Sequence, residues 1–248
     1  METSNAARQL PYVSIRNNFR LVHGQSHHSR AKSSRMSLSN KTRSEIITFV
    51  DIETGGLEFT RPIIQIAAVA IEVADADFVE RESIELKVAF DRRRADPAAL
   101  PFNKFKPHVW KRESLPPIAA AKKFAGFLRR HSTYPMLSKS KRPYRLAQLA
   151  GHNAERFDGP FIHEWYRRLG VYCPARYMTL CTKQKALWLF EEDKLLLPPA
   201  DFKLGTLCQY FGVPLHKRDA HDALVDVRAT VELYRAMCVH QRQQARAA

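Results

Sequence analysis

Acidic residues at three separate places in the sequence lie where apolar side chains would be expected. Asp51 and Glu53 stand two positions apart at the end of a β-branched segment, Glu45 to Glu53. Because side chains alternate across a strand, both carboxylates point to the same face. Neighbouring carboxylates at the end of a buried strand raise each other's pKa unless a cation or solvent relieves them. Taken alone, the pair is more often a solvated strand end than a metal site.

The second acid is Asp158, which begins an expected helix. At 100° per residue it falls on the side of that helix that carries the apolar residues, and therefore points toward the sheet. An N-cap is the alternative explanation, since aspartate is favoured there and Pro160 suits a first turn. A capping role would explain why position 158 is an aspartate, but it would not explain why Asp158 lies on the apolar side of the helix.

The third acid is Asp226, which lies within the apolar arc of the last expected helix, whereas Asp222 falls just outside that arc. Buried carboxylates without a partner are costly, so acids from three elements directed at one region indicate a shared cation. Ligation by oxygen alone suits Mg²⁺ or Mn²⁺ and not zinc. The candidate ligands are Asp51, Glu53, Asp158 and Asp226.

His221 precedes Asp226 by five residues, in the first turn of the same expected helix and on its polar side. A single histidine is usually only a surface residue. Beside a metal cluster, however, an imidazole that titrates near neutral pH is suited to take a proton from an attacking water.

Hydrophobic patterning predicts the elements that position these acids. Strands at 45–53, 63–73 and 83–90 with short turns predict an antiparallel meander. Shorter strands at 146–152 and 177–181 then alternate with expected helices, which cover 117–130, the segment from 158, 182–190, 204–211 and 220–240. This order predicts a mixed α/β sheet covered by helices. Two basic, proline-containing segments, 92–111 and 132–145, are predicted to be irregular.

The amino-acid composition indicates which classes of molecule the protein can bind. The 248 residues contain 40 Lys and Arg against 25 Asp and Glu, a formal net charge of +15. Such an excess attracts polyanions, nucleic acid first and an anionic membrane surface second. No apolar segment approaches the roughly 20 residues of a spanning helix, so we expect no membrane insertion. Four separated cysteines without a C-x-x-C pair favour free thiols in a reducing compartment, and we expect a cytoplasmic protein.

The N-terminal segment 1–44 differs from the rest, with eight Lys or Arg, one acid and no sustained hydrophobic period. We expect a basic, disordered arm. A targeting segment, a nucleic-acid-binding tail and an upstream start before Met36 are the interpretations it leaves open. The folded domain is expected over 45–240, followed by a short tail, 241–248.

Three motifs carry the acids: Phe49 to Gly56 (FVDIETGG), His152 to Asp158 (HNAERFD) and Ala220 to Asp226 (AHDALVD). In this order they resemble the three motifs of the DEDDh, DnaQ-like 3′–5′ exonuclease family, and the resemblance runs from about Glu45 to Met237. The His-x4-Asp spacing of the third motif is typical of the branch that uses histidine rather than tyrosine.

The resemblance implies a ribonuclease H-like fold and two-metal hydrolysis of the 3′-terminal phosphodiester, which releases 5′-mononucleotides. The implied cofactors are two Mg²⁺ or Mn²⁺ ions. By position, the four acids named above would be the metal ligands and His221 the general base. Substrate contacts are implied for Thr54, Gly55, Gly56, Leu57, His152 and Asn153.

Nucleic acid is therefore the expected partner, with DNA ahead of RNA. A non-catalytic nucleic-acid-binding module is one alternative, although the complete set of four acids and a histidine argues against it. A proofreading subunit that works with a polymerase in trans is the other, and a homodimer is also left open. The basic segments 92–94 and 139–145 match no feature of the family and would suit insertions along the substrate path.

Overall fold

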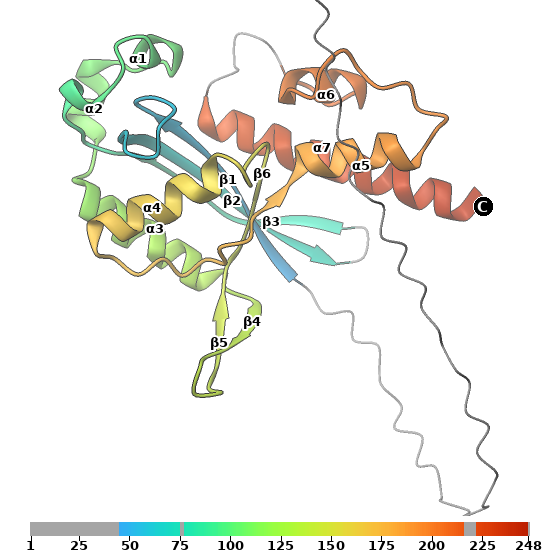
Figure 1. Ribbon diagram of the computed structural model, residues 1–248, viewed down its shortest axis with the longest axis horizontal. Helices are drawn as coiled ribbons and strands as arrows, with labels where there is room; N and C mark the ends of the chain where they lie inside the picture. Colours follow the sequence, from blue (N-terminus) through green and yellow to red (C-terminus); the bar gives the residue numbers. More distant parts are fainter. Residues whose placement is uncertain (1–44, 75–76, 216–221, 248) are drawn as a thin grey trace, which may run out of the picture. The chain divides into compact units, whose positions relative to one another are not determined.

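The computed structural model describes residues 45–74, 77–215 and 222–247. Five strands form one mixed sheet in the order β3-β2-β1-β6-β7 (Figure 1). The strands are β1 (Glu45–Thr54), β2 (Ile63–Ala74), β3 (Asp77–Lys87), β6 (Gln148–Gly151) and β7 (Leu180–Cys181). The first three pair antiparallel, while β6 pairs parallel with both β1 and β7. The predicted mixed sheet, a meander followed by parallel strands, is confirmed.

The central strand β1 buries a different set of side chains on each face. Val50 and Ile52 belong to the core cluster with α3 (Pro117–Arg130) and α4 (Asp158–Leu169). Ile47 and Phe49 belong to the cluster with α7 (Ala223–Ala247). Because side chains alternate along a strand, Asp51 and Glu53 continue the second row and lie on the α7 face.

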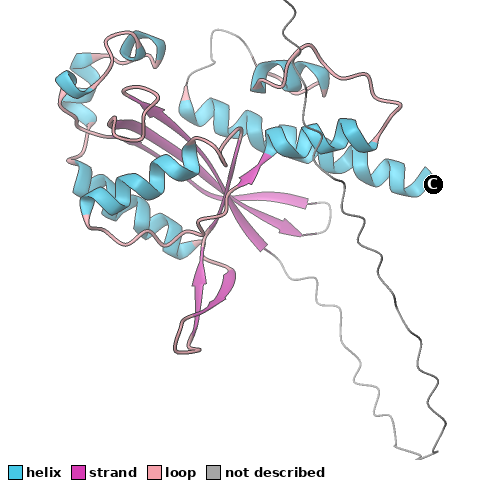
Figure 2. Cartoon of the chain, viewed as in Figure 1, coloured by secondary structure: helices cyan, strands magenta, loops and turns pink. Residues whose placement is uncertain are grey.

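The remaining helices complete the α7 side. α5 (Thr182–Glu192) and α6 (Leu204–Tyr210) bury Leu189 and Leu207 against Leu233 of α7. Figure 2 shows α5 and α6 beside α7 and the α3–α4 pair on the other side of the sheet. None of the described helices has the length and apolarity needed to cross a membrane.

The segment predicted to be irregular, 92–111, contains a 3-10 helix at Arg92–Arg94 and two short helices, α1 (Ala99–Phe102) and α2 (Pro107–Glu113). That prediction is wrong. Proline at the first position of α2 favours a helix, because its missing N–H needs no partner there. Trp110 then anchors α2, since its ring N–H donates to the Ile64 carbonyl at 3.1 Å.

Other boundaries differ as well. β3 begins at Asp77 and ends at Lys87, whereas the strand was predicted over 83–90. The connection predicted over 132–145 is a β-hairpin of β4 (Tyr134–Leu137) and β5 (Pro143–Leu146), separate from the main sheet. Helix α7 runs to Ala247, past the predicted end at His240, because 241–248 holds neither glycine nor proline to end it. The predicted arm, 1–44, lies outside the described residues.

Candidate active site

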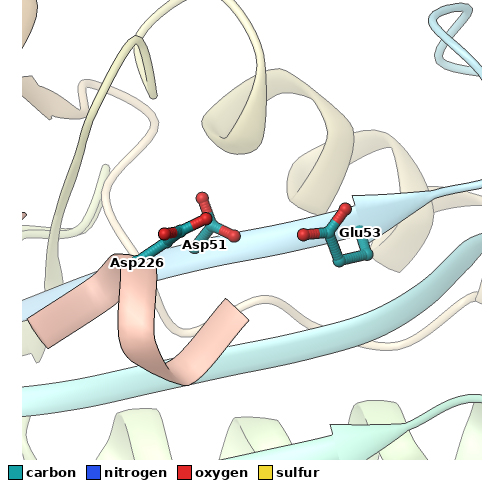
Figure 3. A group of neighbouring side chains, drawn as sticks. All are labelled: Asp51, Glu53 and Asp226. Carbon is teal, nitrogen blue, oxygen red and sulfur yellow. The ribbon is translucent and has the colours of Figure 1, made fainter. Parts of the chain in front are cut away.

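Three acids converge where β1 meets the first turn of α7 (Figure 3). Asp51, Glu53 and Asp226 each offer a carboxylate oxygen, and these oxygens all lie within 4.8 Å of one another. Glu53 and Asp226 are 7% and 9% exposed, and Asp51 is half-buried. Buried carboxylates this close together form an arrangement that a divalent cation can bridge.

Asp158, the fourth acid, lies in the first turn of α4 and is 3% exposed. Its Oδ1 accepts a hydrogen bond from the Ile52 backbone N–H at 3.0 Å. The N-cap of α4 is Phe157, and no side chain caps the helix. The capping explanation of Asp158 is therefore wrong, because the carboxylate reaches across to β1 instead.

Burial and mutual repulsion raise the pKa values of these acids. Burial raises the pKa of Asp51 well above its usual value, and the charges of Asp158, Glu53 and Asp226 add to the rise. Burial first, then Asp226 and Asp158, raise the pKa of Glu53 to about 8, while Lys104 opposes the change. Burial raises the pKa of Asp158 to about 7, against the effect of its backbone hydrogen bonds. Full ionisation of the group needs added positive charge, so the residues present fit divalent cations.

The turn after Glu53 requires both of its glycines. A Cβ on Gly55 would lie 2.8 Å from the Ala95 Cβ, and Gly56 has a φ of +148°, which L side chains rarely adopt. The Thr54 hydroxyl, itself buried, donates to the Gly56 carbonyl at 2.6 Å. Leu57 follows and is 83% exposed. The turn is therefore rigid and presents an apolar side chain to solvent.

A pocket of about 330 Å³ separates this turn from α1. Glu53, Gly56 and Leu57 line one side, and Phe102 and Asn103 line the other. The buried Asn103 side-chain amide donates to the Thr54 carbonyl at 2.7 Å and ties the two sides together. Sequence analysis missed this wall, because no pattern in the segment predicted to be irregular distinguishes Phe102 or Asn103 from its neighbours.

His152 and Asn153, for which the resemblance implied substrate contacts, are not among the residues that line this pocket. The His152 Nε2 lies 3.0 Å from the Phe202 carbonyl, and its Nδ1 lies 3.0 Å from the Thr182 hydroxyl. Since a carbonyl only accepts, Nε2 donates and Nδ1 accepts. Burial lowers the pKa of His152 to about 4. Asn153 has a φ of 61°, a conformation that asparagine tolerates better than most residues, and it turns the chain toward α4.

His221 lies outside the described residues, so its role as a base stays a prediction. Asp222 directly precedes α7, and its backbone carbonyl accepts a hydrogen bond from the Asp226 N–H at 2.9 Å. Asp222 is exposed, as the sequence predicted.

Comparison with known proteins agrees with this geometry. Residues 129–234 match the RNase T family model, described as an exonuclease. A search of curated proteins finds no match. A solved structure of exonuclease I aligns with a TM-score of 0.59 and 18% identity, covering 77% of this chain and 40% of that one. A zinc-bound complex of E. coli exonuclease I with single-stranded DNA aligns with a TM-score of 0.61 and 17% identity, covering 81% and 42%.

A complex of the E. coli enzyme with a dT13 oligonucleotide gives a TM-score of 0.60 and 17% identity, covering 82% of this chain and 43% of that one. This chain thus spans less than half the length of these proteins. At such identities the alignments show that this chain shares the fold of the aligned part of exonuclease I. The family match over residues 129–234 and the shared fold agree: this part of the chain resembles the exonucleases of the RNase T family.

Proposed function

We propose that this protein is a 3′–5′ exonuclease that hydrolyses the 3′-terminal phosphodiester of DNA and releases 5′-mononucleotides. The observation that carries the proposal is the convergence of Asp51, Glu53 and Asp226 within 4.8 Å. Oxygen-only ligands that are largely buried suit Mg²⁺ or Mn²⁺. The family match and the shared fold support the same reaction class.

Asp51, Glu53, Asp226 and the neighbouring Asp158 would hold two cations. When bound, these ions lower the pKa of the attacking water and offset the charge that develops on the departing 3′ oxygen. Asp158 also has a structural role. It accepts a hydrogen bond from the backbone N–H of Ile52, the residue between Asp51 and Glu53, and so holds β1 in place. Burial excludes most water from the four carboxylates and strengthens their hold on a cation.

His221 would accept the proton of the attacking water. In the sequence it precedes Asp222 by one residue and Asp226, one of the proposed ligands, by five. An imidazole with an ordinary pKa is deprotonated in a large fraction of molecules at neutral pH, which is the state a base requires.

The pocket between the Gly55–Gly56 turn and α1 would receive the 3′-terminal nucleotide. Leu57 and Phe102 are 83% and 61% exposed, and they give the pocket apolar sides next to Glu53. A nucleobase stacks well on such side chains. Exonuclease I has been solved with dT13 and dA16 oligonucleotides, which supports DNA as the substrate here too. A polymerase or a second copy as partner remains a prediction.

The test is a degradation assay on three 5′-labelled substrates: single-stranded DNA, a duplex with a recessed 3′ end, and RNA. Each is incubated with Mg²⁺, Mn²⁺ or EDTA. We expect a ladder of shortened products with either metal and none with EDTA, strongest on single-stranded DNA. No ladder with either metal would contradict the proposal.

Asp51→Asn and Asp226→Asn keep the shape of each side chain and remove its charge, and each should lower the rate at least about 100-fold. Asp222→Asn is the matched control. It lies on the same turn of chain as Asp226 and is exposed outside the acid group. Activity that survives Asp226→Asn, or that falls equally in Asp222→Asn, would show that the ligands are assigned wrongly.

A further inference from the structure

The β4–β5 hairpin stands apart from the rest of the domain. Its strands pair only with each other, from Tyr134 opposite Leu146 to Leu137 opposite Pro143. Figures 1 and 2 show it extending away from the five-stranded sheet and the helices. Leu146 is its only buried residue. An isolated two-stranded hairpin is marginally stable and adds little to a core, so packing does not account for it.

The tip of the hairpin is ordered by its own hydrogen bonds. The Ser138 N–H donates to the Arg142 carbonyl, and the Arg142 N–H donates to the Ser138 hydroxyl, both at 2.9 Å. Lys141, between them, has a φ of 59°. Glycine or asparagine would adopt this conformation at lower cost. A lysine there keeps a positive charge at the tip at the expense of backbone strain.

The hairpin is strongly basic. Residues 134–146 contain no Asp or Glu, and their cations are Lys139, Lys141, Arg142 and Arg145. All four side chains are exposed. Among the described residues, none of the four forms an ion pair with a carboxylate. A cluster of cations that the protein leaves unneutralised attracts a polyanion.

Two exposed tyrosines belong to this surface, one on the hairpin opposite Met136 and one after α4. Tyr144 on β5 is 38% exposed and Tyr172, after α4, is 62% exposed. Burial raises the pKa of Tyr172, and the Tyr144 phenol is the next cause, so the two rings are neighbours. Arg129, at the end of α3, is close enough to oppose the rise. Exposed aromatic rings among cations are typical of surfaces that bind single-stranded nucleic acid, because bases stack on the rings while cations contact phosphates.

We propose that the β4–β5 hairpin, together with Tyr144 on β5 and the nearby Tyr172, is a second nucleic-acid contact that binds a single-stranded part of the substrate away from the 3′ end. This inference rests on the proposed function, since it assigns the same substrate to a separate surface. It commits to nucleic acid over an anionic membrane because neighbouring tyrosines beside cations match bases and phosphates together.

The sheet register sets the distance between the two contacts. β6 begins opposite Ile47, beside the hairpin, and the acids lie four to six residues further along β1. Strand rises of about 3.3 Å per residue, over six residues of β1 and four of the hairpin, give a separation on the order of 30 Å. A strand stacked as in a duplex covers about 3.4 Å per nucleotide, so roughly nine nucleotides span this distance, and a stretched single strand spans it with fewer. An oligonucleotide of about 3 nucleotides is too short to reach both contacts.

The first test measures binding in EDTA to fluorescein-labelled oligothymidylates of about 3 and about 30 nucleotides, by fluorescence anisotropy across a salt series. The hairpin variant combines Lys139→Gln, Lys141→Asn and Arg142→Gln; asparagine suits the φ at 141. The control combines Lys111→Gln, Lys194→Gln and Lys203→Gln, which removes three exposed charges elsewhere. We expect the hairpin variant to bind the long oligonucleotide at least about ten-fold more weakly, with a salt slope lower by about 2, and the short one unchanged.

The control should change both affinities less than about two-fold. A second variant, Tyr144→Leu, keeps an apolar side chain on β5 and should weaken long-oligonucleotide binding about five-fold or more, because it removes a stacking ring. Circular dichroism melting curves confirm that each variant is folded. Equal affinity of the hairpin variant and the wild type for the long oligonucleotide would overturn the inference.

Kinetics separate this inference from the proposed function. In the hairpin variant, KM for the long substrate should rise while kcat on a trinucleotide stays at the wild-type value. Wild-type protein inactive on both substrates would defeat the proposed function, yet the binding measurement would still report on the hairpin. Binding to phosphatidylserine vesicles that is lost in the hairpin variant, with oligonucleotide binding intact, would assign the hairpin to membranes and overturn the inference.

Discussion

The carboxylate of Asp158 accepts a hydrogen bond from the backbone N–H of Ile52 at 3.0 Å, and so joins the first turn of α4 to β1 between Asp51 and Glu53. The two elements belong to motifs more than a hundred positions apart. Asp158 therefore has two separable properties: an oxygen that accepts a hydrogen bond, and a negative charge beside the acid group.

Two substitutions of Asp158 should separate these properties. Asp158→Ala leaves the Ile52 N–H buried without a partner, which costs about 1–3 kcal/mol of unfolding free energy, and it also abolishes activity. Asp158→Asn keeps the acceptor and removes the charge, so we expect wild-type stability or higher in EDTA, together with loss of nuclease activity. Urea unfolding and the oligonucleotide assay measure the two effects. Equal destabilisation by both variants would contradict this division.

Metal-free protein should lose stability as pH rises. The pKa values of Glu53 and Asp158 are about 8 and about 7, above their usual values of 4.5 and 3.8. Between about pH 4 and pH 8 the folded state thus holds more protons than the unfolded state, so the unfolding free energy falls with rising pH. Cations that bind the ionised acids reverse the loss. Melting temperatures with Mg²⁺ minus those with EDTA should therefore grow with pH, and a difference that shrinks would be the contrary result.

The acids could be located from the sequence because each breaks a simple pattern. Asp51 and Glu53 interrupt an apolar strand, and Asp226 interrupts the apolar arc of a helix, so alternation and helical periodicity were sufficient. The antiparallel meander of the first three strands followed from β-branched segments separated by short turns. These predictions rest on local regularities, which a single sequence displays directly.

The features that could not be predicted from the sequence depend on contacts between segments that are distant in the chain. Asn103 supports the Gly55–Gly56 turn through a carbonyl 49 positions away, and nothing near Asn103 in sequence signals this. His152 was assigned to substrate because of its motif, whereas its ring nitrogens contact Phe202 and Thr182. The hairpin in the basic segment 132–145 could not be predicted. Its two strands are short, and neither has a buried face that would produce an alternation of apolar and polar residues.

His152 should stabilise the fold most at neutral pH. Burial lowers its pKa to about 4, from a usual 6.5, so between these values the unfolded state holds more protons. The contribution of His152 to the unfolding free energy therefore rises as pH increases through this window, and it is lost as pH falls. His152→Gln lacks this titration, and the stability difference between wild type and His152→Gln should shrink from about pH 7 to pH 4.5. A pH-independent difference in urea unfolding would refute the assignment.

Asn103→Ala should impair the terminal-nucleotide pocket without touching the acid group. It leaves the Thr54 carbonyl without the donor that ties the turn to α1, at a cost of about 1–2 kcal/mol in stability. We expect KM for oligonucleotides to rise several-fold while the affinity for Mg²⁺, from calorimetry, stays unchanged. Asn103→Asp is the sharper companion, because a carboxylate facing the Thr54 carbonyl repels it and should lower activity further. Altered Mg²⁺ affinity in Asn103→Ala would place the residue with the metal ligands instead.

His221→Gln should separate the base from the ligands. If His221 accepts the proton of the attacking water, its loss lowers kcat about 10²–10⁴-fold and removes the acidic limb of the pH–rate profile, because no imidazole remains to be protonated. Its side chain supplies no ligand in our assignment, so Mg²⁺ should still raise the melting temperature as much as in the wild type. Asp226→Asn is the complementary variant, since it should lower both activity and the Mg²⁺-induced stabilisation. A His221→Gln protein that keeps its acidic limb would place the base elsewhere, and one that loses the Mg²⁺ response would make His221 a ligand.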